Sequence, residues 1–348
     1  MEGPVPNPVR VVLIGTGRRP IPPEGYGGIE RTVAELATAL RGRGADVEIL
    51  NQVIPGKYTR GWRFERHLPR LLKREAYDVL HAHTGRAAWV LGWWRLPYIY
   101  TTHTPSWLRP LRLHQRVLFE RERQAVRWAQ ATIATTSEVG QQVERVPRRR
   151  GPVIQIPIGV DAERFRSRTE GEAGRALGVG TVERRKRWDV AARAVSGTSF
   201  KFTLVGPIRD PSYADELRHL GVEVVGEVSE HRLVEEFERA EVVLHPSEFE
   251  TTGFVGAVAQ ALSCSRPVIG GPAIRGLTPL TAASNESNAV ERFLHDSLNS
   301  FEHNPDLMRR FGKEGRELIL RDYSWGIVAD RHLNLYQMIA AKSRVAKH

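Results

Sequence analysis

The chain has 348 residues, of which 41% are hydrophobic and 26% are charged, so its composition excludes a disordered chain or a coiled coil and its length indicates about two domains. Its one cysteine, Cys264, excludes intrachain disulfides and cysteine-based metal sites. The net charge of +11 is concentrated in residues 57–150, which hold nineteen basic and seven acidic side chains, so this segment is expected to attract phosphate groups or an anionic surface.

The N-terminal half of the sequence alternates short apolar runs with amphipathic stretches. Strands are expected at residues 9–15, 47–50, 78–81, 98–102 and 131–135, and helices at 29–43, 64–74, 85–94 and 111–130. The expected strands are continuously apolar, as is typical of strands buried on both faces. Their alternation with helices predicts an α/β fold with a doubly wound parallel sheet.

The same alternation restarts after residue 150 and stops near residue 279. Strands are expected at 153–156, 177–182, 200–205, 222–225, 242–244 and 268–269, and the helices at 288–300, 306–321 and 325–342 follow without strands between them. The expected organisation is an N-terminal domain of residues 1–165, a second α/β domain of residues 166–325 and a C-terminal segment of residues 326–348.

Two loops have compositions that suit phosphate binding. Residues 22–31 are rich in glycine and proline, follow a strand and open a helix, where backbone amides attract a diphosphate. A plain tight turn is the alternative, because the loop has neither the lysine of a Walker A loop nor the glycine spacing of a dinucleotide fingerprint. Residues 184–187 place four consecutive cations at the start of a helix, which is electrostatically unfavourable unless an anion lies among them. A solvated charge run is the alternative there.

Polar residues also follow two other expected strands. His103 comes directly after the strand at 98–102, and residues 245–254 lead from a strand into a helix at 255–262. Ligands of open α/β sheets bind beyond the carboxyl ends of the strands, so these residues are expected to face a cleft between the domains. His81 and His83 are interpreted as a pair at a strand end rather than as a metal site.

Seven short motifs occur in an order and spacing similar to those of a known enzyme family. They are Gly27-Gly28 before a helix, Thr102-His103, and residues 159–161, 180–186, 246–250, 266–268 and 323–325. The chain therefore resembles the family-4 retaining glycosyltransferases of the GT-B architecture over most of its length. The resemblance implies two facing Rossmann-like domains with doubly wound parallel sheets, and a C-terminal helix that crosses back to the N-terminal domain.

The resemblance also implies roles for individual residues. The implied catalytic residues are His103, which would contact the sugar, Arg185 and Lys186, which would hold the donor diphosphate, and Glu250. The implied donor-binding residues are Gly27, Gly28, Arg185, Lys186, Thr252, Gly253, Phe254 and Gln260. Two fixed cations stabilise the charge that develops on a leaving diphosphate, so neither a metal ion nor a cofactor is implied.

The sequence departs from the family pattern at its pair of glutamates. Matching backward from residues 266–268 puts Thr252 and Gln260 at the two acidic positions, whereas matching forward from residues 246–247 puts Glu250 and Val258 there. Only a loop longer by two residues uses Glu250 and Gln260 together, which is the interpretation favoured here. The acidic turn that the family has after residue 270 is also missing.

A basic face is expected on the helix at 111–130. Arg112, Arg116, Arg123 and Arg127 fall within one narrow arc of the helical wheel, and tryptophans flank the helix. Such a face suits an anionic membrane surface, and a solvated face is the alternative. Nucleic acid is not expected as a partner, because no nucleic-acid motif accompanies the charge.

The function expected from the resemblance is retaining transfer of a sugar from a nucleotide-diphosphate sugar to an acceptor hydroxyl. The expected acceptor is a glycan, a lipid-linked saccharide or another membrane acceptor. The alternatives are a catalytically impaired GT-B protein that acts as partner of another transferase, and a sugar-nucleotide epimerase. The protein is expected in the cytoplasm, where it can attach to the inner face of the membrane, because the sequence shows neither a signal peptide nor a membrane-spanning stretch.

Overall fold

The computed structural model describes residues 8–23, 27–51, 62–72, 77–103, 105, 116–167, 169–248, 250 and 256–345. The chain divides into two units, of which unit 1 is Met1–Gly159 with Trp325–His348 and unit 2 is Val160–Ser324. The first division falls at Gly159, a few residues before the boundary expected at 165. The last helix begins at Trp325 and belongs to unit 1.

Unit 1 is built on a six-stranded sheet in which every described pairing is parallel. Its strands are β1 (Arg10–Ile14), β2 (Asp46–Leu50), β3 (Val79–Ala82), β4 (Ile99–Thr102), β5 (Ala131–Ala134) and β6 (Val153–Gln155). The order β2-β1-β3-β4-β5-β6 reverses direction between β1 and β3. In doubly wound sheets the ligand crevice lies at such a switch point, beyond the carboxyl ends of the strands.

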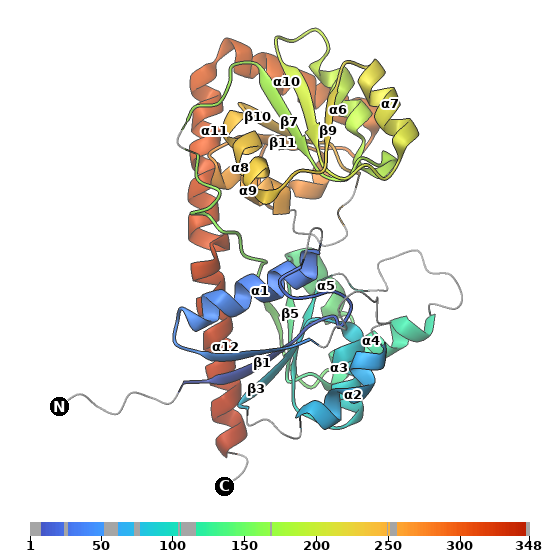
Figure 1. Ribbon diagram of the computed structural model, residues 1–348, viewed down its shortest axis with the longest axis vertical. Coiled ribbons are helices and arrows are strands. Elements are labelled where there is room, and N and C mark those ends of the chain that lie inside the picture. Colours follow the sequence, from blue (N-terminus) through green and yellow to red (C-terminus); the bar gives the residue numbers. More distant parts are fainter. Residues whose placement is uncertain are drawn as a thin grey trace, which may run out of the picture. The chain divides into compact units, whose positions relative to one another are not determined.

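Helices cover both faces of this sheet (Figure 1). They are α1 (Gly28–Arg41), α2 (Trp62–Leu72), α3 (Gly85–Trp93), α4 (Arg116–Trp128), α5 (Ser137–Glu144) and α12 (Trp325–Val345). The apolar side chains of α1 and α12 pack on one face, and those of α2, α3, α4 and α5 pack on the other. Sequence reasoning missed α5. The residue that could have indicated it is Thr136, which caps the N-terminus of this helix: the Thr136 side chain accepts a hydrogen bond from the backbone N–H of Val139.

The C-terminal helix is fastened to unit 1 by polar contacts as well as by its apolar face. The indole N–H of Trp325 donates to Glu35 of α1 at 2.7 Å. Gly159 leaves room for this ring, because a Cβ there would lie 2.4 Å from the Trp325 side chain. The hydroxyl of Tyr336, a fully buried residue of α12, lies 2.7 Å from Nδ1 of His81 in β3. The expected return of the last helix to the N-terminal domain is therefore present.

Unit 2 repeats the design with a five-stranded sheet, again parallel in every described pairing. Its strands are β7 (Arg175–Val179), β8 (Lys201–Val205), β9 (Glu223–Gly226), β10 (Val242–His245) and β11 (Val268–Gly270). The order β11-β10-β7-β8-β9 places the switch point between β7 and β10. The chain leaves β7 at residues 180–187 and leaves β10 after His245, in the two segments that the sequence singles out.

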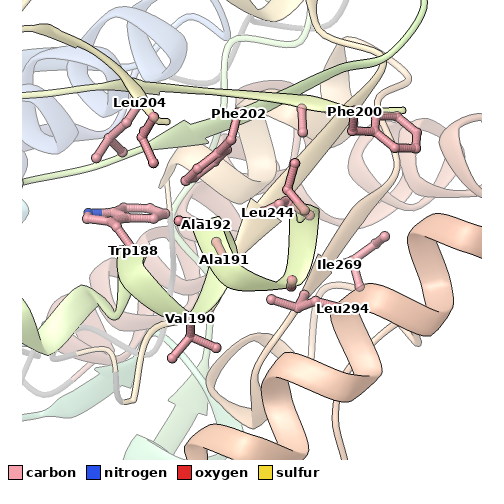
Figure 2. Close-up of a cluster of buried hydrophobic side chains, with 14 of the residues drawn as sticks. Trp188, Val190, Ala191, Ala192, Phe200, Phe202, Leu204, Leu244, Ile269 and Leu294 are labelled. Atoms are coloured by element: carbon pink, nitrogen blue, oxygen red, sulfur yellow. The ribbon is translucent and has the colours of Figure 1, made fainter. Parts of the chain in front are cut away.

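The core of unit 2 forms around Trp188, the first residue of α6 (Figure 2). The other helices are α7 (Pro211–His219), α8 (Glu230–Arg239), α9 (Gly256–Ser263), α10 (Ser287–His303) and α11 (Pro305–Leu318). The Trp188 side chain is fully buried beside Phe202, with ring centroids 6.4 Å apart, and its indole N–H donates to the Thr181 carbonyl at 2.9 Å. The core thus holds the start of the loop that carries the cations.

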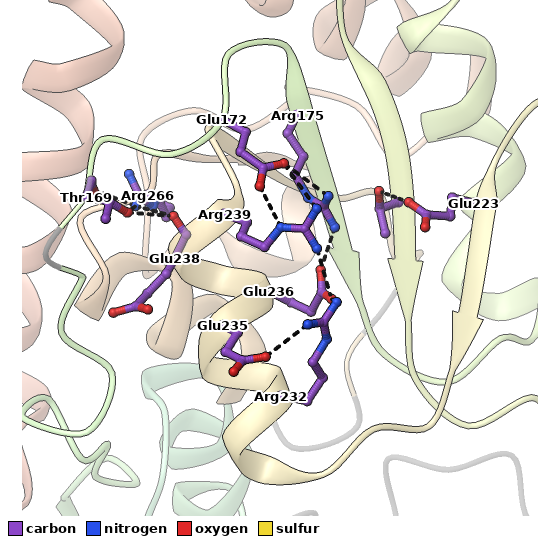
Figure 3. A network of polar contacts seen from close by, with 11 residues as sticks. Thr169, Glu172, Arg175, Glu223, Arg232, Glu235, Glu236, Glu238, Arg239 and Arg266 are labelled. Atoms are coloured by element: carbon purple, nitrogen blue, oxygen red, sulfur yellow. Dashed lines mark hydrogen bonds and ion pairs between the residues drawn. The ribbon is translucent and has the colours of Figure 1, made fainter.

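A polar network ties α8 to the neighbouring chain segments of unit 2 (Figure 3). Arg175 pairs with Glu236, whose side chain is 1% exposed. Arg266 is buried, and its guanidinium donates to the carbonyl oxygens of Thr169 and Glu238 at 2.7 Å each. Arg266 belongs to one of the seven motifs, and in this structure its role is to hold the backbone rather than to bind a ligand.

Candidate active site

The cation loop of unit 2 leaves β7 at the switch point. Gly180 has φ +158° and Gly206 has φ +148°, and a Cβ on Gly206 would lie 2.0 Å from the Gly180 carbonyl oxygen, so only glycine lets the two turns pack. Arg185 and Lys186 lie on a short 3-10 turn (Arg184–Lys186), which ends at Arg187 in the left-handed conformation with φ 54°. The run of cations is therefore a folded turn before α6, not the helix start that the sequence predicts.

Glu250, which follows β10, gathers the polar groups of this site. Nζ of Lys186 lies 2.7 Å from Oε1 of Glu250, and a terminal guanidinium nitrogen of Arg185 lies 3.9 Å from Oε2. Nε2 of His245, the last residue of β10, also lies 2.7 Å from Oε1. The side chains of Lys186 and Glu250 are 10% and 9% exposed. The structure therefore brings together three of the four implied catalytic residues, and it adds His245, which sequence reasoning did not assign.

These contacts keep the Glu250 side chain ionised. Burial by itself raises the pKa of Glu250, but the hydrogen bond from His245 and the positive charge of Lys186 outweigh it and hold the pKa well below its usual value. Burial lowers the pKa of His245. Since a carboxylate can only accept, Nε2 of His245 carries the proton of this hydrogen bond. Glu250 is thus a fixed anion between a lysine and a histidine.

Arg185 has a second acidic partner on its own loop. A terminal guanidinium nitrogen of Arg185 donates to Glu183 at 2.7 Å, and the same oxygen of Glu183 accepts from the Thr181 hydroxyl at 2.7 Å. Together with Glu250, Glu183 supplies the anion that the cation run requires. Because 28% of the Arg185 side chain is exposed, its charge can still reach a ligand. The loop therefore holds two cations in place before any diphosphate binds.

The remaining donor residues of unit 2 are only partly placed. Thr252, Gly253 and Phe254 lie outside the described residues. Gln260 is partly buried in α9, whereas Val258 of the same helix is fully buried in the core. Because Val258 cannot meet a ligand, the forward match of the glutamate pattern loses its second position. Gln260, the second position of both other matches, is partly exposed.

The glycine loop of unit 1 reaches α1 as expected. Gly27 precedes the helix in extended conformation and Gly28 is its first residue, where a Cβ would meet no atom within 4 Å. The first turn of α1 also holds Glu30, a buried acid that accepts from the Thr16 hydroxyl at 2.6 Å. An acid in the first turn already complements the positive end of the helix dipole, so an anionic ligand would share this end with Glu30.

His103 belongs to a cluster of four buried histidines at the carboxyl edge of the unit 1 sheet. Nδ1 of His83 lies 3.3 Å from Nε2 of His103, and the rings of His81 and His83 are 4.2 Å apart between centroids. His332 of α12 completes the cluster, with its ring 5.8 Å from that of His81. A pocket lined by His83, His103 and His332 opens here, with Thr101 and Trp325 among its other walls.

This cluster is neutral near pH 7. Burial and the neighbouring histidines lower the pKa values of His81 and His83 well below 6.5. Burial, with a smaller contribution from His332, lowers the pKa of His103 to about 4. Burial also lowers the pKa of His332 to about 4, although its hydrogen bond to the Val328 carbonyl opposes the shift. Nε2 of His83 is buried without a hydrogen-bond partner among the described residues. No group of histidines and acids in the described part of the chain has the geometry of a metal site.

The cluster makes the stability of unit 1 dependent on pH. A histidine with a native pKa near 4 and an unfolded pKa near 6.5 binds fewer protons when folded, so stability is full above pH 6.5 and falls as the pH is lowered toward 4. His103 and His332 are each expected to lower the free energy of unfolding by about 2 kcal/mol between about pH 7 and pH 5. Urea unfolding at the two pH values measures the loss. His103→Gln and His332→Gln should each reduce it, and an unchanged loss in both variants would contradict this assignment.

The predicted basic face of α4 is largely neutralised in the part that the structure describes. Arg123 and Arg127 both pair with Glu120, at 3.9 and 3.0 Å. Arg112 lies outside the described residues, and of Arg116 only the backbone is described, as the first residue of α4. Leu118 of the same helix is 36% exposed. The face therefore carries less free charge than the helical wheel indicates. In the described chain, no helix is both long and apolar enough to cross a bilayer.

Solved structures share this fold. Sucrose-phosphate synthase from Thermosynechococcus elongatus superposes with a TM-score of 0.76 at 20% identity, over 96% of this chain and 100% of that chain. Anabaena Alr3699/HepE in complex with UDP and glucose superposes with a TM-score of 0.72 at 15% identity, over 94% of this chain and 99% of that chain. Two doubly wound parallel sheets with a returning C-terminal helix define this chain as a GT-B protein.

Sequence comparisons place the chain within that class. Residues 26–164 match the model of Glycosyltransferase Family 4, and residues 174–290 match that of Glycosyl transferases group 1. Alpha-maltose-1-phosphate synthase of Mycolicibacterium smegmatis is 26% identical over 93% of this chain and 98% of its own length. D-inositol 3-phosphate glycosyltransferase of Actinosynnema mirum is 27% identical over 75% of this chain and 80% of its own length. The chain belongs to the family-4 glycosyltransferases and is a glycosyltransferase enzyme.

Proposed function

We propose that this enzyme transfers a sugar from a nucleotide-diphosphate sugar to an acceptor hydroxyl with retention of the anomeric configuration. The observation that carries the proposal is the pair Arg185 and Lys186, held by Glu183 and Glu250 beyond the carboxyl end of β7. The switch point of a doubly wound sheet is where nucleotides bind, and two fixed cations suit a diphosphate. The UDP complex of the similar Anabaena protein supports this class of donor.

In the proposed mechanism, Arg185 and Lys186 bind the diphosphate and stabilise the charge that it acquires. The bond between the anomeric carbon and the diphosphate oxygen breaks, and the acceptor oxygen forms its bond to the same face of that carbon. The acceptor proton goes to the departing diphosphate. Electrostatic stabilisation of a leaving group by preorganised cations is effective in a partly buried site, and no step requires a metal ion.

Glu250 has a distinct part in this proposal. When a diphosphate takes over the charge of Lys186, Glu250 keeps its hydrogen bond to His245 and has an oxygen available for a sugar hydroxyl. Gln260 would contact the nucleoside more weakly than an acid, because a neutral amide forms weaker hydrogen bonds to hydroxyls than a carboxylate does. His103 would approach the sugar as a neutral ring, consistent with its lowered pKa of about 4.

The acceptor that we propose is a lipid-linked saccharide or another membrane acceptor, reached from the cytoplasmic side. The support is the concentration of positive charge in residues 57–150, which favours an anionic surface. One of the similar enzymes is a D-inositol 3-phosphate glycosyltransferase and another is an alpha-maltose-1-phosphate synthase, so small phosphorylated compounds belong in any acceptor screen.

The experiment that tests the function is a donor titration followed by product analysis. Purified enzyme is titrated with nucleoside diphosphates and their sugars in the presence of a metal chelator, and transfer is then followed by proton NMR of the anomeric signal. Binding of one donor, with a product of the same anomeric configuration as that donor, is the expected result. Inversion would overturn the retaining mechanism. A folded sample that neither binds nor hydrolyses any donor would overturn donor transfer and favour a catalytically impaired partner protein.

A further inference from the structure

Two tryptophans are exposed side by side at the end of α3. Trp93 is 65% exposed and Trp94 is 58% exposed, and among the large apolar side chains of the described residues only Val117 is exposed to the same degree as Trp94. Trp93 leans on Trp89 of the same helix, with ring centroids 5.5 Å apart. Trp89 and Trp128 pack against the hydrophobic core on this side of the sheet, whereas Trp93 and Trp94 are not among the residues of that core.

Three arginines near this end of α3 have no acidic partner among the described residues. Arg95 directly follows the pair, Arg121 of α4 lies with its guanidinium 4.6 Å from the Trp89 ring centroid, and Arg150 precedes β6. All three are exposed, and none has an ion pair among the residues that the structure describes. The other arginines of α4, Arg123 and Arg127, are both paired with Glu120. We call Trp93, Trp94, Arg95, Arg121 and Arg150 the tryptophan–arginine surface.

A groove lies beside this surface and includes two of its arginines. Arg95 and Arg150 stand on its rim, and Leu96 and Trp128 are part of its wall. Gly92 makes the wall possible, because a Cβ there would lie 2.3 Å from the Trp128 ring. Arg95 has φ 57°, a conformation that side-chain-bearing residues rarely adopt, which turns the chain sharply after the tryptophan pair. The surface therefore adjoins a groove whose lining combines Leu96, Pro97 and Trp128 with polar and cationic side chains.

The location of this surface separates it from the candidate active site. Leu96 leads into β4, Gln130 precedes β5 and Arg150 precedes β6, so the groove lies at the amino ends of these strands. Gln130 N–H donates to the Tyr98 carbonyl at 2.8 Å, which keeps these approaches together. His103 follows the carboxyl end of β4, at the opposite edge of the same sheet. A ligand of the groove would leave the carboxyl edge free.

The chemistry of the surface points to one kind of partner. Tryptophan rings favour the boundary between lipid headgroups and acyl chains, because the apolar ring can contact acyl chains while its polar N–H contacts the headgroups. Arginines beside them neutralise phosphate headgroups, each contributing to binding of an anionic leaflet. The surrounding segment, residues 57–150, has nineteen basic and seven acidic residues, so a negatively charged surface is attracted from a distance as well.

We propose that the tryptophan–arginine surface docks unit 1 on a bilayer that contains anionic phospholipids. Trp93 and Trp94 insert at headgroup depth, and Arg95, Arg121 and Arg150 contact lipid phosphates. The proposal rests on the proposed function only for its purpose, which is to bring the enzyme to a membrane acceptor. It differs from the basic face predicted on the helix at 111–130, whose described arginines are engaged by Glu120.

The test is vesicle flotation of the full chain without any sugar donor, so that its result is independent of transfer activity. One set of vesicles is phosphatidylcholine alone, and another contains about one third phosphatidylglycerol. The wild-type chain is expected to float with the anionic vesicles and to be released when salt is raised to about 1 M. Equal flotation with both vesicle types, or none with either, would overturn the proposal.

Variants locate the binding surface. Arg95→Gln with Arg150→Gln is expected to weaken binding about 30-fold, since each arginine near an anionic leaflet contributes roughly fivefold. Trp93→Ser with Trp94→Ser is expected to weaken it at least about tenfold. Lys201→Gln with Arg292→Gln, two exposed cations of unit 2, is the charge-matched control and should bind as the wild type does.

The same variants also separate docking from folding. Each must keep the wild-type urea unfolding curve and the wild-type affinity for the nucleotide donor, since the groove belongs to unit 1 and the cation loop to unit 2. A variant pair that folds normally and still floats like the wild type would overturn the assignment of this surface. Equal weakening by the control pair would overturn it too, because binding would then follow net charge alone.

Discussion

Replacing Arg185 and Lys186 together by alanine is expected to lower kcat/KM for sugar transfer by at least about 1,000-fold. Each removes a preorganised positive charge from the leaving diphosphate, and a single donor of this kind is worth about 100-fold or more. Donor affinity should fall as well, because both cations contact the ground-state diphosphate in the proposed complex. Steady-state kinetics and a donor titration of the double variant measure the two effects.

A neighbouring arginine provides the control for this double variant. Arg184 belongs to the same turn, but its side chain is 62% exposed and pairs with Glu216 and Asp210. Arg184→Ala removes a charge from the same loop and is expected to change kcat/KM by less than about tenfold. If Arg184→Ala were as damaging as the double variant, general charge and not the two positioned cations would explain the loss. Wild-type activity of the double variant would remove Arg185 and Lys186 from the mechanism.

The Lys186→Ala change by itself also tests the internal ion pair. Glu250 would keep His245 as its partner but lose the cation at 2.7 Å, so a carboxylate that is 9% exposed would lack its countercharge. Its pKa should then rise from the depressed value that Lys186 and His245 hold together. The residual activity of the Lys186→Ala variant, measured as a function of pH, should therefore begin to fall at a higher pH on the acid side than that of the wild type.

Truncating Trp188 is expected to destabilise unit 2 by about 3–5 kcal/mol. Trp188→Ala deletes the largest fully buried side chain and leaves a cavity among β-strand side chains that include Phe202. It also leaves the Thr181 carbonyl without the indole N–H that donates to it at 2.9 Å. Urea unfolding followed by far-ultraviolet circular dichroism measures the loss of stability.

Two further variants separate packing from positioning at this residue. Trp188→Phe refills much of the cavity that Trp188→Ala leaves, so it should recover stability. It cannot donate to the Thr181 carbonyl, however, and the loop that begins at Thr181 carries Arg185 and Lys186. The affinity for the donor should therefore stay below that of the wild type. Trp93→Ala, at a position that is 65% exposed, should leave the unfolding free energy within about 0.5 kcal/mol of wild type. A Trp188→Ala protein as stable as wild type would contradict the central place of this ring in the core.

The cation loop shows why the site could be recognised in the sequence but not built from it. Four consecutive cations after an apolar strand are visible as a pattern, and the need for an anion among them follows from the helix dipole. The anion itself is Glu250, 64 residues away from Lys186, and it reaches the loop only because β7 and β10 are neighbours at the switch point. His245 belongs to the segment 245–254 that the sequence singles out, but it received no role there because a lone histidine at a strand end has no sequence signature.

The basic helix shows the opposite outcome. A helical wheel places Arg123 and Arg127 together correctly, but it cannot tell that Glu120 pairs with both of them. The tryptophan pair at 93–94 reads in the sequence as part of an apolar stretch that could be buried. Its 65% and 58% exposure depends on where α3 ends and on the left-handed turn at Arg95.

The sequence by itself determined the α/β class, most strand and helix positions and the family, because periodicity, continuous apolar strands and short motifs are local properties of the chain. Tertiary structure alone decided the partners of the buried polar groups: Glu250 for Lys186 in unit 2, and Tyr336 of α12 for His81 in unit 1. These partners come from strand order and helix packing, which join residues distant in sequence. The free energy of a buried charge depends on such neighbours, so the chemistry of the site could be read only after the fold.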